Sequence, residues 1–363
     1  MSNFLPTALK YRPTTFQQVI GHDVSKRIMI NSILMDRQIK CMLVSGIRGI
    51  GKTTLGRLYA KSVNCDNFTN DACNLCPSCV EALNGSHPDI IEIDSASNNG
   101  VDFVRELVEI LRQAPLYKKR VIIFDECHMM TPQAQAALLK VLEEPPHENL
   151  SFILVTTNPV KLENTIRSRC LPIPLSQLKP AEIAQNLLNI LQKEGYEADP
   201  DILHTLSIQG GGSLRDVQQM LDQLILAAGG TCKLDSKDLR AAFGILSVDE
   251  YKRLAATLNS KDIRGSINAV SDWVSDGMDL TLLYETGVPT LLRDFSVVLS
   301  GAYTDKISLY SGLSADLIKN RLQLSLKDVK VFFEIWENVF PMLKGANRPE
   351  VVWQLFLVRL FQD

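Results

Sequence analysis

The 363-residue sequence contains no apolar run near the roughly 20 residues that a membrane-spanning helix needs. Its first residues, Met1–Pro6, lack the basic start and the long apolar core of a secretory signal peptide. It also contains no repeat, no low-complexity tract and no long proline-rich linker. These absences predict a cytoplasmic protein that does not contact a membrane.

An excess of basic charge is missing as well. Lys and Arg total 38 against 41 Asp and Glu, which gives a formal net charge of -3. A dedicated nucleic-acid binder is usually basic overall, so any contact with DNA must come from a local patch. Apolar residues make up 45% and charged residues 22%, a balance typical of globular proteins with buried cores. At this length we expect two or three domains.

The first half of the chain has the pattern of an α/β domain. Up to about residue 178, short apolar runs alternate with helical stretches, which predicts a mostly parallel sheet. The expected strands are Cys41–Ser45, Asp89–Asp94, Val121–Asp125, Ser151–Thr156 and Leu171–Leu175. The expected helices between them include Thr53–Asn64, Val101–Gln113 and Pro132–Glu143.

The second half of the chain is expected to be helical, because strand signals stop after residue 179. Helices that begin at Pro180, at Pro200 and at the capping box Ser213–Asp216 predict a small helical domain over residues 179–238. Residues 239–363 contain all three tryptophans and no pattern of a chemical site. For this last part we expect a role in packing or assembly.

A phosphate-binding loop is predicted at Gly46–Thr53, which fits G-x-x-x-x-G-K-[ST] between an expected strand and an expected helix. The glycines allow backbone N–H groups to turn toward phosphate oxygens, and the helix N-terminus adds partial positive charge. Lys52 is expected to reach the β- and γ-phosphates, and the Thr53 hydroxyl to bind Mg²⁺. The alternative is a chance glycine-rich turn. The expected nucleotide-binding residues of this loop are Gly46, Gly49, Ile50, Gly51, Lys52, Thr53 and Thr54.

Two carboxylates end the apolar run Val121–Phe124. A buried strand of this kind delivers Asp125 to the edge of the sheet where ligands bind, so Asp125 is expected to hold the metal. Glu126 is placed to polarise the attacking water. A strand that merely ends in acidic surface residues is the alternative. The next strand ends at Thr156, and the polar residues Thr157 and Asn158 follow it.

Four cysteines lie within fifteen residues, at positions 65, 73, 76 and 79. Two-residue spacings let thiolates meet at one tetrahedral ion, and four soft ligands suit a structural Zn²⁺. Disulfides or an iron–sulfur cluster are the alternatives. The remaining cysteines are scattered, and we interpret them as packing residues or free thiols: Cys41, Cys127, Cys170 and Cys232.

Four stretches in this order resemble the AAA+ clamp-loader ATPases: Gly46–Thr53, Asp125–His128, Ser168–Cys170 and Gly212–Asp216. The four-cysteine insert after the loop helix is similar to the gamma/tau family of bacterial DNA polymerase III subunits. Lys10–Pro13, Ile93–Val101 and Ala137–Pro146 support the resemblance. It is most specific over about residues 9–226 and weaker over the C-terminal helices.

The resemblance implies an AAA+ P-loop domain over 1–178 with a zinc module at about 65–79, a helical lid over 179–238 and an all-α collar over 239–363. It implies that Arg169 is an arginine finger for a neighbouring subunit and that Arg215 is a second sensor for its own site. Thr157 aligns with the first sensor, with Asn158 as the alternative. The adenine is expected to be bordered by Tyr11, Arg12, Pro13, Val19 and Ile20. The alternative, which the residues alone would favour, is that Arg167 and Arg169 belong to an ordinary basic loop.

The resemblance also implies partners and cofactors. The cofactors are ATP, Mg²⁺ and Zn²⁺. The partners are copies of the chain and delta- and delta-prime-like subunits in a ring, the sliding clamp, and primer–template DNA contacted by Lys140 and the Asn98–Gly100 turn. The implied activity is ATP hydrolysis, without a polymerase active site. We expect a short form that ends at the collar.

Three other functions fit parts of the sequence. A Holliday-junction branch-migration motor shares the AAA+ motifs, although the four-cysteine insert counts against it. A subunit that does not hydrolyse ATP, like delta-prime, requires a broken P-loop, and this P-loop is intact. A zinc-dependent nucleic-acid binder with an incidental P-loop is the third.

Overall fold

The computed structural model describes residues 5–37, 39–243, 246, 248–260, 262–275, 278, 280–303, 313–321, 324–343 and 349–362. The chain forms two compact units, Met1–Ile183 with Gly212–Asp216, and Ala184–Gly211 with Val217–Asp363. Within the described residues, none of the helices combines the length and the apolar character that crossing a bilayer requires.

The first unit contains a five-stranded parallel sheet. Its strands are β1 (Cys41–Ser45), β2 (Ile90–Asp94), β3 (Arg120–Asp125), β4 (Leu150–Thr156) and β5 (Leu171–Pro174), in the spatial order β2-β3-β4-β1-β5. Because neighbouring strands are all parallel, their carboxyl ends share one edge, where Ser45 pairs in register with Thr156. The five expected strands are confirmed, with bounds that shift by at most one residue.

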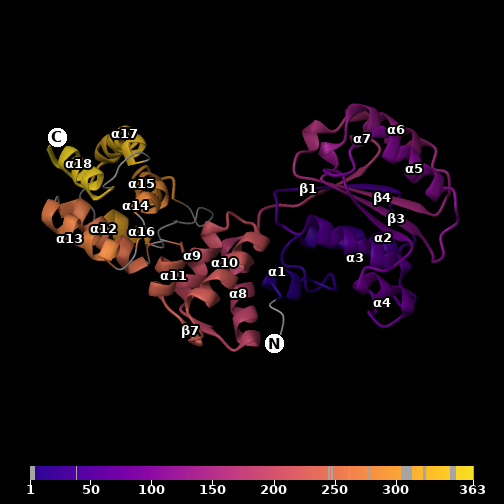
Figure 1. Ribbon diagram of the computed structural model, residues 1–363, viewed down its shortest axis with the longest axis horizontal. Coiled ribbons are helices and arrows are strands. Elements are labelled where there is room, and N and C mark those ends of the chain that lie inside the picture. Colours follow the sequence, from indigo (N-terminus) through magenta and orange to yellow (C-terminus); the bar gives the residue numbers. More distant parts are fainter. Residues whose placement is uncertain are drawn as a thin grey trace. The chain divides into compact units, whose positions relative to one another are not determined.

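Helices cover both faces of this sheet. The helices of the first unit are α1 (Thr7–Lys10), α2 (Asp23–Leu34), α3 (Lys52–Asn64), α4 (Pro77–Asn84), α5 (Val101–Leu111), η1 (Cys127–Met129), α6 (Pro132–Glu143), η2 (Pro159–Lys161) and α7 (Asn164–Arg167), of which only some lie on the sheet. Helices α2 and α3 lie on one side, and α5, α6 and α7 on the other (Figure 1).

The strand sequences explain this two-sided covering. On β3, Ile122 and Phe124 join a buried core with residues of α5 and α6. The residue between them, Ile123, faces α3, where a Cβ added to Gly56 would lie 3.8 Å from its side chain. Both faces of the strand are therefore apolar, as expected of a buried parallel sheet.

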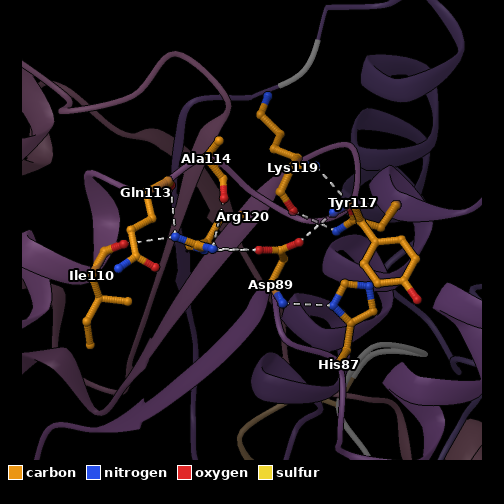
Figure 2. Close-up of polar contacts among 9 residues, drawn as sticks. His87, Asp89, Ile110, Gln113, Ala114, Tyr117, Lys119 and Arg120 are labelled. Atoms are coloured by element: carbon orange, nitrogen blue, oxygen red, sulfur yellow. Dashed lines mark hydrogen bonds and ion pairs between the residues drawn. The ribbon is translucent and has the colours of Figure 1, made fainter.

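A buried ion pair ties the sheet to the end of α5. Asp89 is fully buried, and its carboxylate lies 2.9 Å from Arg120 Nη2. Arg120 Nη1 also donates to the carbonyls of Ile110 and Gln113 at 2.9 and 3.0 Å, while Asp89 Oδ2 accepts from Tyr117 N at 2.7 Å (Figure 2). These bonds satisfy both buried charges, which makes the pair tolerable in the core.

The second unit is predominantly helical, which confirms the expected character of the C-terminal half. Its helices are α8 (Pro180–Glu194), α9 (Pro200–Gln209), α10 (Leu214–Ala227), α11 (Ser236–Phe243), α12 (Val248–Ser260), α13 (Ile263–Ser275), α14 (Leu280–Leu282), the π-helical turn η3 (Leu283–Gly287), α15 (Val288–Leu299), α16 (Ala315–Arg321), α17 (Leu326–Leu343) and α18 (Pro349–Gln362); the first residues of α8 and α10 belong to the first unit. The boundary expected at residue 238 stays a prediction.

Two very short strands were not expected after residue 179. They are β6 (Glu197–Ala198) and β7 (Lys233–Leu234), which pair in parallel. Each has two residues, too few to produce an alternating pattern in the sequence. Elsewhere in this unit, Tyr284 packs edge-on against Trp353, with ring centroids 5.5 Å apart, in the core of the C-terminal helices.

Candidate active site and metal centre

The loop of residues 46–51 leads from the end of β1 into α3. Gly51 has φ +102, and a Cβ added there would meet nothing within 4 Å, so this side of the loop is open. Gly49 has φ +73, and a Cβ there would lie 2.0 Å from Ser213 Oγ. Both positions therefore require glycine, one for its backbone conformation and one also for space.

Lys52 begins α3 and points back over the loop. Its side chain is buried, and Nζ donates to the carbonyl of Ile47 at 2.9 Å. Burial lowers the pKa of Lys52, while nearby Glu126 and Asp125 oppose the shift. The ammonium therefore lies on the phosphate loop, where a bound triphosphate would require positive charge.

The two sequence motifs meet through a direct hydrogen bond. Thr53 Oγ1 donates to Asp125 Oδ2 at 2.8 Å, and Asp125 Oδ1 accepts from the backbone N–H of Glu126 at 2.9 Å. A hydroxyl beside a carboxylate is the type of oxygen pair that Mg²⁺ prefers. The residues therefore fit the metal predicted for them.

Glu126 has a backbone conformation that is rare for a residue with a side chain, with φ +47. Thr157 Oγ1 donates to Glu126 Oε2 at 3.3 Å, and His128 Nδ1 lies 3.3 Å from the same oxygen. His128 Nδ1 is also 3.1 Å from Thr156 Oγ1. His128 received no role from the sequence, although it stands two residues after Glu126. Asn158, the alternative to Thr157, is exposed.

The segment expected to border the adenine lies beside the loop. Burial lowers the pKa of Arg12, with Arg57 and Arg215 acting in the same direction and Glu92 and Asp125 opposing. The expected neighbours Tyr11, Pro13 and Ile20 are half-buried and Val19 is buried. His22 Nε2, close after this segment, lies 3.2 Å from the carbonyl of Ile50.

Arg215 also lies at the loop. Its backbone N–H donates to the carbonyl of Gly49 at 3.2 Å. Ser213 Oγ accepts from Asp216 N at 3.3 Å, so the expected serine cap is present at the start of α10. The start of α10 therefore lies against the phosphate loop.

Arg169 lies at the other edge of the sheet. It precedes the amino end of β5, whereas the phosphate loop follows the carboxyl end of β1, and these strands are parallel. Its guanidinium pairs with Glu143 and donates to the carbonyl of Thr165 at 2.9 Å. In this arrangement Arg169 is remote from Lys52 of its own chain and is exposed at the surface.

The residues suggested for DNA lie near the α5–α6 face. Lys140 is exposed and lines a groove of about 640 Å³ between these helices. Asn98 Nδ2 donates to the carbonyl of Asp94 at 3.2 Å, and the Asn99 carbonyl accepts from Thr131 N at 3.0 Å. The Asn98–Gly100 turn is thus joined to the start of α6.

The four clustered cysteines form a candidate metal centre. Their sulfur atoms all lie within 4.8 Å of one another, and Cys73 Sγ is 3.9 Å from Cys79 Sγ. Zn–S bonds of about 2.3 Å in a tetrahedron place sulfurs about 3.8 Å apart, so the cluster fits the ion. The amide N–H groups of Leu75 and Cys76 lower the pKa of Cys73 to about 6. The structure contains no disulfide between any of the eight cysteines.

Comparisons with known proteins decide the family. The gamma subunit of DNA polymerase III from Buchnera aphidicola subsp. Acyrthosiphon pisum is 30% identical, and the match covers 99% of each chain. The chain belongs to the gamma/tau family of DNA polymerase III subunits. A family model described as "DNA polymerase III, delta subunit" matches residues 21–179, and one described as "DNA polymerase III clamp loader subunit, ATPase lid domain" matches residues 182–230.

Longer relatives in the gamma/tau family match over part of their length. The Mycoplasma pneumoniae gamma/tau subunit is 37% identical over 74% of this chain and 40% of its own. The Escherichia coli tau subunit is 37% identical over 81% of this chain and 46% of its own. The chain thus spans less than half the length of these two relatives.

A solved structure supports the AAA+ fold. RuvB of Thermotoga maritima, a Holliday junction branch migration motor, superposes with a TM-score of 0.51 at 14% identity. The match covers 85% of this chain and 88% of that chain. At this identity the likeness concerns the fold alone.

Proposed function

We propose that this gamma/tau family member is an ATPase subunit of a clamp loader, which uses ATP to load a sliding clamp onto primed DNA. The observation that carries the proposal is the hydrogen bond between Thr53 and Asp125, which joins the phosphate loop to the strand-end carboxylates. We propose that the protein acts in DNA replication in the cytoplasm.

Each residue of the site has a proposed role. The backbone of residues 46–51 and the Lys52 ammonium hold the triphosphate, and Thr53 with Asp125 hold Mg²⁺, which would neutralise charge on the phosphates. Glu126 orients and polarises the attacking water. The contact from Thr157 to Glu126 supports a role for Thr157 in positioning that carboxylate.

Arg169 is proposed to act on a neighbouring subunit. Its position before β5, at the amino ends of the strands, supports this role, because the phosphate loop of its own chain follows the opposite ends. A guanidinium spreads several donors over the charge that develops on the transferred phosphoryl group. Hydrolysis then depends on a correctly assembled ring. Arg215, beside Gly49, is the proposed sensor of its own site.

The remaining proposals concern structure and partners. The zinc held by Cys65, Cys73, Cys76 and Cys79 would stabilise a polar segment that cannot form a core of its own. Lys140 and the Asn98–Gly100 turn would contact the DNA backbone without reading bases. Residues 239–363 would hold the ring of copies and delta- and delta-prime-like subunits together. No polymerase activity is proposed for this chain.

ATP turnover, measured with and without clamp and primed DNA, tests the proposal. We expect turnover to rise when clamp and primed DNA are present together in the assembled complex. Strand unwinding in place of clamp loading would favour a branch-migration motor. Absence of ATP turnover in the complete complex would favour a structural subunit, and salt-dependent DNA binding without ATP would favour a zinc-dependent DNA binder.

A further inference from the structure

The cysteine segment is hydrogen-bonded to the segment that precedes α2. Asp71 lies two residues before Cys73, and its Oδ1 accepts from Phe16 N at 2.5 Å. Its Oδ2 accepts from Gln17 N at 3.1 Å. The same turn is closed by Val19 N, which donates to the carbonyl of Phe16 at 3.1 Å. One carboxylate therefore satisfies two backbone donors at the start of this turn.

Lys61 makes a second connection between these segments. It lies on α3 and is only 3% exposed. Its Nζ donates to the carbonyl of Thr14 at 2.5 Å and also to Asn74 Oδ1, inside the Cys73–Cys76 loop. Burial lowers the pKa of Lys61, while the surrounding Cys79 and Asp71 oppose the shift. A buried cation thus stands between the thiols and residue 14, where thiolates bound to a metal would offset its charge.

The segment that follows the Phe16–Val19 turn contacts the phosphate loop. Phe16 is 1% exposed and Val19 is 6% exposed, so the turn is anchored in the core. The carbonyl of Val19 accepts from Lys26 Nζ at 2.9 Å. His22 then reaches the carbonyl of Ile50. Asp71, two residues before Cys73, therefore contacts the Phe16–Val19 turn, and His22, three residues after this turn, contacts the phosphate loop.

We propose that Asp71 and Lys61 are positioning residues for the adenine side of the nucleotide site, so that the metal held by the four cysteines sets the affinity for the base. This inference rests on the proposed function, because it takes residues 11–20 as the adenine-bordering segment. The phosphates are bound by residues 46–53, which Asp71 does not contact. Loss of the metal or of Asp71 is therefore expected to weaken binding of the base much more than binding of the phosphates.

Two ligands separate these effects. Dissociation constants for ATP and for inorganic tripolyphosphate are measured by calorimetry on the full chain, for the wild type, Asp71→Ala and Asp71→Asn. The zinc content of each protein is checked.

Asp66→Asn is the matched control, because Asp66 lies in the same segment, is about half exposed and pairs with Lys118 at 3.7 Å. For Asp71→Ala we expect ATP to bind about tenfold more weakly, as for a lost charge-assisted contact, and tripolyphosphate to bind within about twofold of wild type. Asp71→Asn, which keeps one acceptor oxygen, should lie between, and the control should bind both ligands normally.

Equal weakening of both ligands by Asp71→Ala, or no weakening of either, overturns the inference. A wild-type protein that binds neither ligand would instead refute the nucleotide site itself, so the two failures are distinguishable. Hydrogen exchange provides a readout without nucleotide. The amides of Phe16 and Gln17 should exchange faster after chelation of the metal and in Asp71→Ala. Unchanged exchange at these amides after the metal has left also overturns the inference.

Discussion

Thr53 and Asp125, which are 72 positions apart in the sequence, are joined by a hydrogen bond of 2.8 Å between Oγ1 and Oδ2. Thr53 follows β1 through the phosphate loop, and Asp125 ends β3, two positions away in the sheet order. Only β4 separates these strands, so their carboxyl ends converge on one site. This relationship brings the two motifs together at the site proposed to bind nucleotide and Mg²⁺.

Replacing Lys52 by Ala should weaken ATP binding by at least about tenfold, because a charge-assisted contact to the phosphates is lost. Binding of a fluorescent ATP analogue measures this, and clamp loading should be lost with it. Lys233→Ala, which removes an exposed lysine of β7 outside the site, serves as the control for loss of a lysine. A Lys52→Ala protein that loads clamps normally would contradict the mechanism.

Replacing Glu126 by Gln should separate binding from hydrolysis. The amide keeps the size of the side chain but cannot accept a proton from water, so turnover should fall by about 10²- to 10⁴-fold. The affinity for ATP should stay within about twofold, because the phosphates are bound by other residues. Single-turnover hydrolysis and equilibrium binding measure the two effects. Equal losses of turnover and of ATP affinity would show that Glu126 maintains the structure of the site and does not act on the attacking water.

Replacing Arg169 by Ala should leave ATP binding intact and reduce hydrolysis in the assembled ring by about 10³-fold. Mixed with Lys52→Ala subunits, which keep Arg169 but not the site, it should regain part of its activity. Arg167→Ala, two residues away, is the matched control. If both arginine variants lose activity equally, the ordinary basic loop is the better interpretation.

Replacing Asp89 by Ala should lower the free energy of unfolding by about 3–5 kcal/mol, because Arg120 is left buried without its partner. Asp89 is fully buried and the Arg120 side chain is 7% exposed (Figure 2). Urea unfolding measures the change. Asp102→Ala removes an exposed pair with Arg105 and should change stability by less than about 1 kcal/mol. Similar losses in the two variants would contradict this explanation.

Replacing Cys79 by Ser should remove bound zinc and destabilise the first unit, because a fully buried ligand is lost. Metal analysis should find about one zinc per wild-type chain and much less in the variant. Cys232→Ser, an exposed thiol outside the cluster, should keep both zinc and stability. Iron and sulfide in place of zinc would favour the iron–sulfur alternative.

The sequence by itself determined the features that depend on residues close to one another along the chain. The strands, the phosphate loop and the spacing of the four cysteines are local patterns, so they could be recognised without the fold. The two-residue strands β6 and β7 are too short to produce a pattern in the sequence. The ends of the longer strands were predicted to within one residue, since apolar runs stop abruptly at polar residues such as Asp125.

The tertiary structure alone decided which distant residues meet. The motifs predict that Thr53 and Asp125 share one metal, but their direct hydrogen bond depends on the strand order, which no local pattern specifies. The same holds for the distance between Arg169 and the phosphate loop of its own chain. Arg169 precedes the amino end of β5, the loop follows the carboxyl end of β1, and the two strands are parallel. In the sequence Asp71 is one polar residue of a polar segment, whereas in the structure its carboxylate accepts hydrogen bonds from the amides of Phe16 and Gln17. Such contacts form because packing brings separate segments together, and that packing is a property of the whole chain.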